Sequence, residues 1–164
     1  MALPCKKVTT MPSPADLPTC RPADLPTCRP ADLPPGVLSH VSIGTNDYGR
    51  AKAFYDAVLA TLQIGVVMEH AGIAVAYGRA FPGFWVGLPH DGGKAAVGNG
   101  LHLGFLATSR EQVDDFHAKA LEMGGQSDGA PGPRELYGPQ YYGAFVRDLD
   151  GHKIEAMFWD ESAG

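Results

Sequence analysis

A chain of 164 residues with a hydrophobic fraction of 45% is expected to form one globular domain, and no apolar run reaches the length of a membrane span. A net charge of −5 without clustered Lys and Arg argues against a nucleic-acid-binding surface. All three cysteines lie before residue 29, so no disulfide framework ties the chain together. No secretory signal is readable, and we expect a cytoplasmic protein without nucleic-acid or membrane partners.

The first 36 residues read as a Pro-rich tail. The unit Pro-Ala-Asp-Leu-Pro begins at Pro14, Pro22 and Pro30, with a period of eight residues. Proline lacks the amide hydrogen that the interior of a helix or strand requires, so we predict that residues 1–36 are a disordered tail, dispensable for the fold. The alternative is metal or thiol chemistry at Cys20 and Cys28, but their spacing is wider than that of typical zinc pairs and no His accompanies them.

A strand–helix–strand pattern starts at Val37. Residues 37–44 alternate as in a strand, and Thr45, Asn46 and Asp47 then offer caps for a helix that ends at Gly65. Apolar residues recur at helical spacing in this helix: Ala51, Phe54, Tyr55, Val58, Leu59 and Leu62. Three short strands, separated by Gly and Pro, are predicted after the helix: 65–69, 73–77 and 84–88.

The same order then repeats. Residues 101–106 read as a strand, Ser109 begins a helix, and Gly124 ends it. We expect a loop in the Gly- and Pro-rich segment that follows. Strands at 141–147 and 152–159 complete the pattern.

The two halves align at a constant offset of 62 residues, which brings His40 onto His102 and keeps the apolar positions of the two helices in phase. An internal repeat of this kind predicts an α+β domain, 37–160, made of two βαβββ modules (37–90 and 99–160) that form a cupped mixed sheet. We expect the modules to bury their apolar sheet faces against each other and to leave a pocket on the concave side.

Three side chains are candidate metal ligands. His40 and His102 occupy equivalent positions on the first strand of each module, and Glu155 lies in the last strand among apolar neighbours, where an unpaired carboxylate would be costly. Two neutral imidazoles and one carboxylate match the facial set used by non-haem Fe(II), and they also suit Mn, Ni, Co or Zn. The alternative for a strand His is ordinary packing, which is the interpretation we give to the remaining four: His70, His90, His117 and His152.

The repeat and the motifs L-S-H-V-S-I-G, L-H-L-G-F and F-V-R-D-L-D-G-H-K-I-E resemble the glyoxalase I, bleomycin-resistance and extradiol dioxygenase (vicinal oxygen chelate) superfamily over Val37 to Trp159. The resemblance implies that His40, His102 and Glu155 coordinate a metal. Glyoxalase-I-like members usually carry a fourth ligand on the last strand of the first module, and residues 84–89 contain no Glu, Gln or His. The site therefore resembles the three-ligand pattern of the dioxygenase members.

The function implied is that of a divalent-metal-dependent enzyme acting on a small substrate that chelates the metal through vicinal oxygens, either a glyoxalase-like lyase or isomerase or an extradiol-type dioxygenase. Glu155 would be a ligand or the catalytic base. The alternative is a metal-free protein that sequesters a ligand, as bleomycin-resistance-type members do. We also expect a homodimer, and the metal site is then built either within one chain or from His40 of one chain with the other two ligands of its partner. The substrate-binding candidates are Trp85, Tyr142 and Arg147, with Tyr137, Tyr141 and Arg134 also available.

Overall fold

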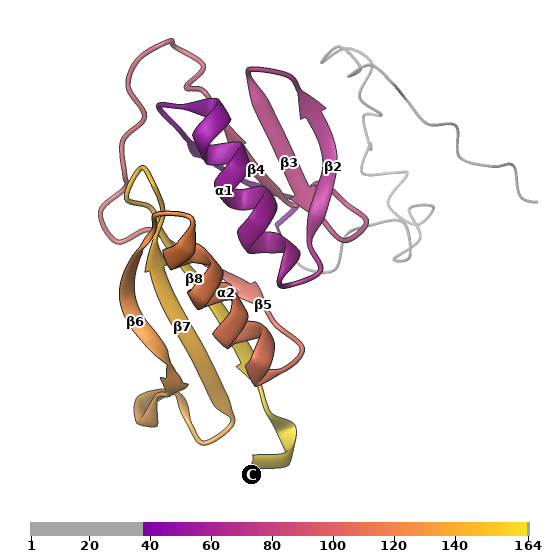
Figure 1. The fold of residues 1–164 in the computed structure, drawn as a ribbon, viewed down its shortest axis with the longest axis vertical. Helices are drawn as coiled ribbons and strands as arrows, with labels where there is room; N and C mark the ends of the chain where they lie inside the picture. The colour runs from indigo at the N-terminus through magenta and orange to yellow at the C-terminus, as the bar shows by residue number, and fades with distance from the viewer. Residues whose placement is uncertain (1–37, 164) are drawn as a thin grey trace, which may run out of the picture. The chain divides into compact units, whose positions relative to one another are not determined.

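The computed structural model describes residues 38–163, so the predicted tail and its cysteines lie outside the described residues. The described chain is an α+β protein in which a βαβββ unit occurs twice, with two four-stranded sheets (Figure 1). Within residues 38–163, no helix is long and apolar enough to cross a membrane.

The first module runs through β1 (Val41–Gly44), α1 (Tyr48–Ala60), β2 (Gly65–His70), β3 (Ala74–Gly78) and β4 (Phe84–Gly87). Its strand order is β1-β4-β3-β2, with β1 parallel to β4 and the other pairs antiparallel. Asp47 caps α1, because its side chain accepts a hydrogen bond from the Arg50 amide. The predicted strands, helix and cap are confirmed.

The second module runs through β5 (His102–Leu106), α2 (Arg110–Glu122), β6 (Gln126–Pro133), β7 (Tyr141–Arg147) and β8 (Lys153–Trp159), with short 3₁₀ turns η2 (Glu135–Tyr137) and η3 (Glu161–Ala163). The strand order β5-β8-β7-β6 reproduces that of the first module, with β5 parallel to β8. Ser109 caps α2 by accepting from the Gln112 amide, as its position in the sequence predicted.

The segment after α2 forms strand β6, and the loop predicted there is wrong. Pro131 and Pro133 lie in this strand, which is at the edge of the sheet and pairs only with β7. A proline on an edge strand can turn its missing amide hydrogen away from the ladder. The register between β6 and β7 also shifts on both sides of Gly129, where φ is +154°. At such irregularities a residue is left out of the regular pairing, which allows Gly and Pro to occur within this strand.

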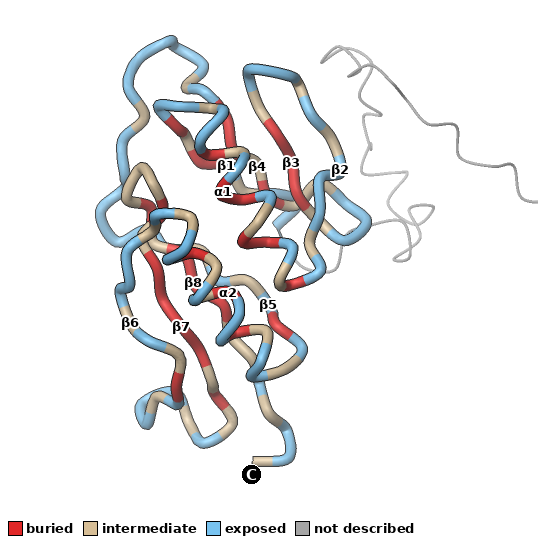
Figure 2. The backbone as a smooth tube through the Cα atoms, in the orientation of Figure 1, coloured by how far each residue is buried: buried red, intermediate tan, exposed pale blue. Residues whose placement is uncertain are grey.

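The two modules share one hydrophobic core on the side of the sheets that the helices cover. Phe54 and Val58 of α1 join Phe116 of α2 and Ile154 of β8 in this cluster, and Phe84 meets Phe105 across the modules with ring centroids 5.1 Å apart. Figure 2 shows buried stretches along both helices and the inner strands, whereas β2 and β6 are largely exposed. The expectation that the modules pack through free apolar sheet faces is therefore corrected, because each module's own helix already covers that face.

The turn between β7 and β8 connects the second module to the first. It makes five cross-module hydrogen bonds. The Tyr55 hydroxyl donates to Asp148 (2.6 Å), the Thr45 hydroxyl and the backbone and side-chain amides of Asn46 donate to Asp150 (2.5, 3.1 and 2.9 Å), and His152 Nε2 donates to the Gly44 carbonyl (2.8 Å). Because a carbonyl only accepts, the proton of the His152 imidazole is assigned to Nε2. We call these contacts the inter-module latch.

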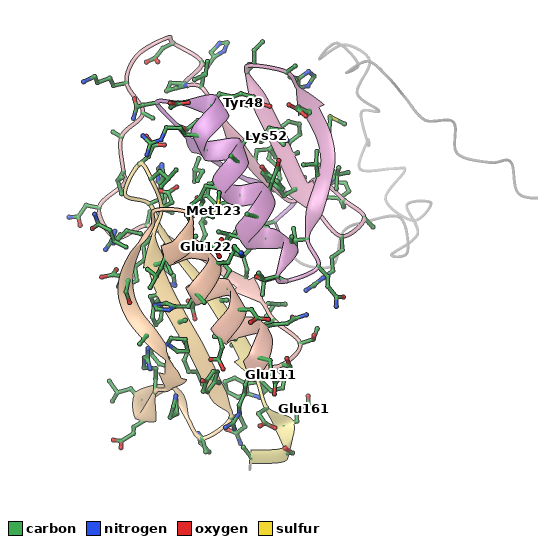
Figure 3. The ribbon with its side chains drawn as sticks, viewed as in Figure 1. Tyr48, Lys52, Glu111, Glu122, Met123 and Glu161 are labelled. Atoms are coloured by element: carbon green, nitrogen blue, oxygen red, sulfur yellow. The ribbon has the colours of Figure 1, made fainter. Side chains whose placement is uncertain are left out.

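Tyr48 and Lys52 attach α1 to the edge strand β2 (Figure 3). The Tyr48 hydroxyl donates to Glu69 at 2.7 Å, and Lys52 Nζ lies 3.9 Å from the same carboxylate and 2.6 Å from Asp56. Burial, followed by the hydrogen bond and charge of Glu69, raises the pKa of Tyr48 to about 12. These surface contacts position an edge strand and contribute little stability on their own.

Candidate functional site

The second sheet has two chemically different faces. Successive residues of a strand point to opposite faces, and the residues of β5, β7 and β8 that join the core, such as Phe105, Val146 and Ile154, face α2. Their neighbours in sequence occupy the other side. We call it the outer face, and it carries His102, Tyr141, Phe145, Lys153 and Glu155.

His102 and Glu155 lie together on the outer face. β5 and β8 are parallel neighbours in which Gly104 is paired with Glu155, and His102 Nε2 lies 3.0 Å from Glu155 Oε2. Gly104 lies directly beside this carboxylate, since a Cβ there would be in van der Waals contact with the same oxygen at 3.4 Å. The carboxylate is buried, with 7% of the residue exposed, whereas the His102 side chain is 48% exposed. Two of the three predicted ligands are thus adjacent.

Tyr141 holds the second oxygen of this carboxylate. Its hydroxyl donates to Glu155 Oε1 at 2.6 Å. The Tyr141 ring lies over Gly143, where any Cβ would collide with it, so glycine is required at that position for the ring to reach Glu155. Burial raises the pKa of Tyr141, and the hydrogen bond and charge of Glu155 raise it further. The sequence offered Tyr141 only as one of several tyrosines, and the glycine two residues later on the same face was the signal that could have singled it out.

A cavity of about 650 Å³ opens beside His102. Its wall includes His102, Asp128, Arg134, Phe145, Arg147 and Lys153. Arg147, a predicted substrate contact, therefore lines it. Arg147 Nε and Lys153 Nζ lie 3.0 and 3.3 Å from the same Asp128 oxygen, and the hydrogen bond from Lys153, followed by the charges of both cations, lowers the pKa of Asp128.

His40 and Trp85 lie in the first module. His40 is exposed, directly precedes β1, and has its Nδ1 3.0 Å from the Ser39 hydroxyl. Trp85 is half-buried on β4 and alternates with two core residues, so it occupies the face of the first sheet opposite α1. Its indole donates to the Pro82 carbonyl at 3.1 Å. Across residues 38–163, no three His, Cys, Asp or Glu side chains are grouped so that they could hold a metal ion, so His40 does not join the pair within one chain.

Tyr142 lies on the helix side of β7, next to Tyr141 in sequence but on the opposite face. Its hydroxyl donates to Asp114 of α2 at 2.8 Å, and the Arg110 guanidinium lies 5.3 Å from its ring centre. The structure therefore places Tyr142 against α2, away from the outer face.

The His102–Glu155 pair fits a divalent metal ion. His102 Nε2 and Glu155 Oε2 are within hydrogen-bonding distance of each other, at 3.0 Å. Two ligand atoms of one octahedral ion, each at about 2.1 Å and at right angles, have about the same separation. An imidazole nitrogen and a carboxylate oxygen suit a borderline cation such as Fe(II), Mn, Co, Ni or Zn. The Tyr141 hydrogen bond is the kind of contact that orients a ligating carboxylate. Two protein ligands are fewer than such a site requires, so a metal bound here would need a third donor from outside this pair.

Comparison with curated proteins finds no match. The family model "Glyoxalase/Bleomycin resistance protein/Dioxygenase superfamily" matches residues 37–156. A glyoxalase/bleomycin resistance protein from Albidiferax ferrireducens T118 is 41% identical, covering 74% of this chain and 98% of its own, with a TM-score of 0.67. The fold is shared with a lactoylglutathione lyase from Agrobacterium tumefaciens (18% identity, 76% and 93% covered, TM-score 0.52) and the fosfomycin resistance protein FosX from Listeria monocytogenes (15%, 78% and 97%, 0.54). The chain therefore belongs to the glyoxalase/bleomycin resistance protein/dioxygenase superfamily.

Proposed function

We propose that this protein is a divalent-metal-dependent enzyme that acts on a small substrate chelating the metal through two adjacent oxygens. One observation carries the proposal: a buried carboxylate, Glu155, is held by the Tyr141 hydroxyl and lies 3.0 Å from the imidazole of His102 at the wall of a cavity. Membership of the glyoxalase/bleomycin resistance protein/dioxygenase superfamily, and a fold shared with a lactoylglutathione lyase, support it.

The third ligand in this proposal is His40 of a second copy of the chain. The outer face carries apolar side chains beside the site, with Leu106 66% and Trp159 48% exposed, and a second copy would cover them. A two-fold dimer would make two equivalent sites. In each, His102 and Glu155 come from one subunit and His40 from the other.

A divalent ion at this site would polarise the chelating oxygens of the substrate as a Lewis acid. Glu155 is the proposed ligand and also the proposed proton acceptor. Its carboxylate lies next to His102, and a carboxylate oxygen can either bind a metal ion or accept a proton from the substrate. Tyr141 keeps its Oε1 occupied and leaves Oε2 directed to His102. Arg147 on the cavity wall and Trp85 on the free face of the first sheet are the proposed substrate contacts. Turnover under air but not under nitrogen would assign the dioxygenase class, and turnover under both the lyase or isomerase class.

Metal content tests the proposal directly. Protein purified without added metal should contain about one divalent ion per chain, and His102→Ala should lose it. His117→Ala is the matched control, since His117 lies on α2 with Nε2 hydrogen-bonded to Ser127 at 2.8 Å. A metal-free wild type that binds no divalent ion on titration would contradict the proposal and leave a metal-free ligand-binding protein.

Mixing two inactive variants tests whether subunits share the site. His40→Ala removes the ligand that each subunit is proposed to supply to the site of its partner. Glu155→Gln removes a ligand that each subunit is proposed to supply to its own site. After the two are unfolded together and refolded, half of the dimers are mixed, and each mixed dimer contains one complete site. About a quarter of the wild-type sites should therefore return. No recovery, with each variant alone folded and dimeric, would place all ligands in one chain.

A further inference from the structure

We propose that the cavity beside His102 is an anion-binding subsite for a carboxylate or phosphoryl group. Its assignment to the substrate rests on the proposed function, which would then act on a small acid carrying both a chelating oxygen pair and a separate anionic group. The subsite itself depends only on residues of the described chain.

The charge of the cavity wall is the first observation. Arg134, Arg147 and Lys153 line the cavity with one carboxylate, Asp128, although the whole chain has a net charge of −5. All three cations are half-buried, so their interaction with an anion in the cavity is less screened than at the open surface. An excess of positive charge in a concave site of an acidic protein attracts an anionic ligand.

The partners of the cations are the second observation. Asp128 is shared by Arg147 and Lys153, at 3.0 and 3.3 Å, and so balances only one of them. Arg134 donates to the Ala130 and Pro133 carbonyls at 2.7 and 3.0 Å, and no carboxylate within residues 38–163 forms a salt bridge with it. These carbonyls orient the guanidinium without neutralising it. Arg134 is therefore a positioned cation, and a planar guanidinium suits carboxylate and phosphoryl oxygens.

The Phe145 ring organises these groups around the proposed metal ligand. Lys153 Nζ lies 4.6 Å and Arg134 Cζ 5.8 Å from the ring centre, distances at which an aromatic ring attracts a cation. The His102 ring meets the same phenyl ring edge-on at 6.2 Å. In the strand register, Lys153 is paired with His102 and Phe145 with Glu155, so the cations around Phe145 and the His102–Glu155 pair share one stretch of the outer face. A small bifunctional acid could contact both ends at once.

Binding of two small anions to the full-length, chelator-treated protein tests the subsite. Isothermal titration with methylphosphonate and with acetate should give saturable binding of at least one probe, with a Kd of about 1 mM or tighter. The stronger probe identifies the phosphoryl or carboxylate class. Arg134→Gln and Lys153→Gln should each weaken binding about ten-fold or more, as expected for loss of a hydrogen bond to a charged group.

Arg110→Gln is the matched control. It removes the same charge, but Arg110 pairs with Asp160 at 3.0 Å on the helix side of the sheet and should leave anion affinity within about two-fold. Equal losses in Arg110→Gln and Arg134→Gln, or no saturable binding of either probe to the wild type, would overturn the subsite. Because the titration uses metal-free protein and requires no turnover, it can fail while the metal site holds, and it can succeed if the metal site fails.

Discussion

At the scale of single residues, the Tyr141 hydroxyl holds the Glu155 carboxylate by a hydrogen bond, and Gly143 leaves the space that the Tyr141 ring occupies. Tyr141→Phe removes only the hydroxyl and leaves Glu155 Oε1 without its 2.6 Å donor in a buried setting. If Glu155 holds a metal, affinity should fall about ten- to a hundred-fold, because contacts that orient a ligand have effects of this size. Metal titration of the apoprotein measures the change.

Tyr142→Phe is the control for that variant. It removes the same atom from the next residue, whose hydroxyl contacts Asp114 on the helix side, and metal affinity should stay at the wild-type value. Equal affinities in the two variants would show that Tyr141 does not position the carboxylate.

Glu155→Gln separates a metal ligand from a structural carboxylate. The amide keeps the size of the side chain and can still accept from Tyr141, so the fold should survive. Loss of the negative charge should lower metal affinity at least ten- to a hundred-fold. Since a ligand that binds only the folded state stabilises it, chelator should lower the melting temperature of the wild type and not that of the variant. Identical metal content in both proteins would exclude Glu155 as a ligand.

At the scale of elements, local signals predicted most of the fold. Caps at Asp47 and Ser109 and apolar residues at helical spacing identified both helices, because these signals act within a few residues. The Gly- and Pro-rich sequence of β6 concealed a strand, since its pairing with β7 is a tertiary contact that local propensity does not report. His152, interpreted as an ordinary packing residue, is buried and also donates a hydrogen bond across the modules, a role that depends on distant packing.

The buried end of the inter-module latch should be worth a measurable part of the stability. Tyr55 is fully buried, and its hydroxyl donates to buried Asp148. Tyr55→Phe leaves that carboxylate one donor short, which costs about 1–3 kcal/mol of unfolding free energy. Chemical denaturation measures the loss. Tyr48→Phe, whose hydroxyl contacts the half-exposed Glu69 within one module, should lose less. The reverse ranking would show that the latch is not a principal contact.

The other end of the latch predicts a pH dependence. Burial opposes ionisation of Asp150, but hydrogen bonds from Thr45 and Asn46 outweigh it and lower the pKa of the carboxyl. A depressed pKa in the folded state adds stability above the ordinary value of about 3.9, and this is lost as the pH falls through the folded pKa. Asp150→Asn should thus be less stable than wild type at pH 7, and the difference should shrink below about pH 4. A difference independent of pH would contradict this.

At the scale of the whole molecule, the sequence repeat placed His40 and His102 at corresponding positions, directly before β1 and at the start of β5, but it did not predict whether they lie close together. Equivalence in a repeat relates two residues by the symmetry of the modules, and it does not predict contact between them. In one chain, Glu155 is beside His102, and His40 lies outside any three-residue metal cluster of residues 38–163. The proposal that a second subunit supplies the third ligand concerns assembly, on which the periodicity of a single chain carries no information.

We predict that the protein is a homodimer whose interface includes the apolar part of the outer face. Leu106 is 66% exposed and pairs in register with Met157 on β8, two residues beyond Glu155. Leu106→Lys would place a charge in the proposed interface, and burying an unpaired charge costs several kcal/mol. Light scattering at micromolar concentration should give a dimer for the wild type and a monomer for the variant. Because the dimer is proposed to supply His40, the monomeric variant should also lose its metal, although its own His102 and Glu155 are unchanged. Leu121→Lys on α2, 39% exposed on the helix side, should remain a metal-bound dimer. A wild type that is monomeric yet binds metal would contradict the shared site.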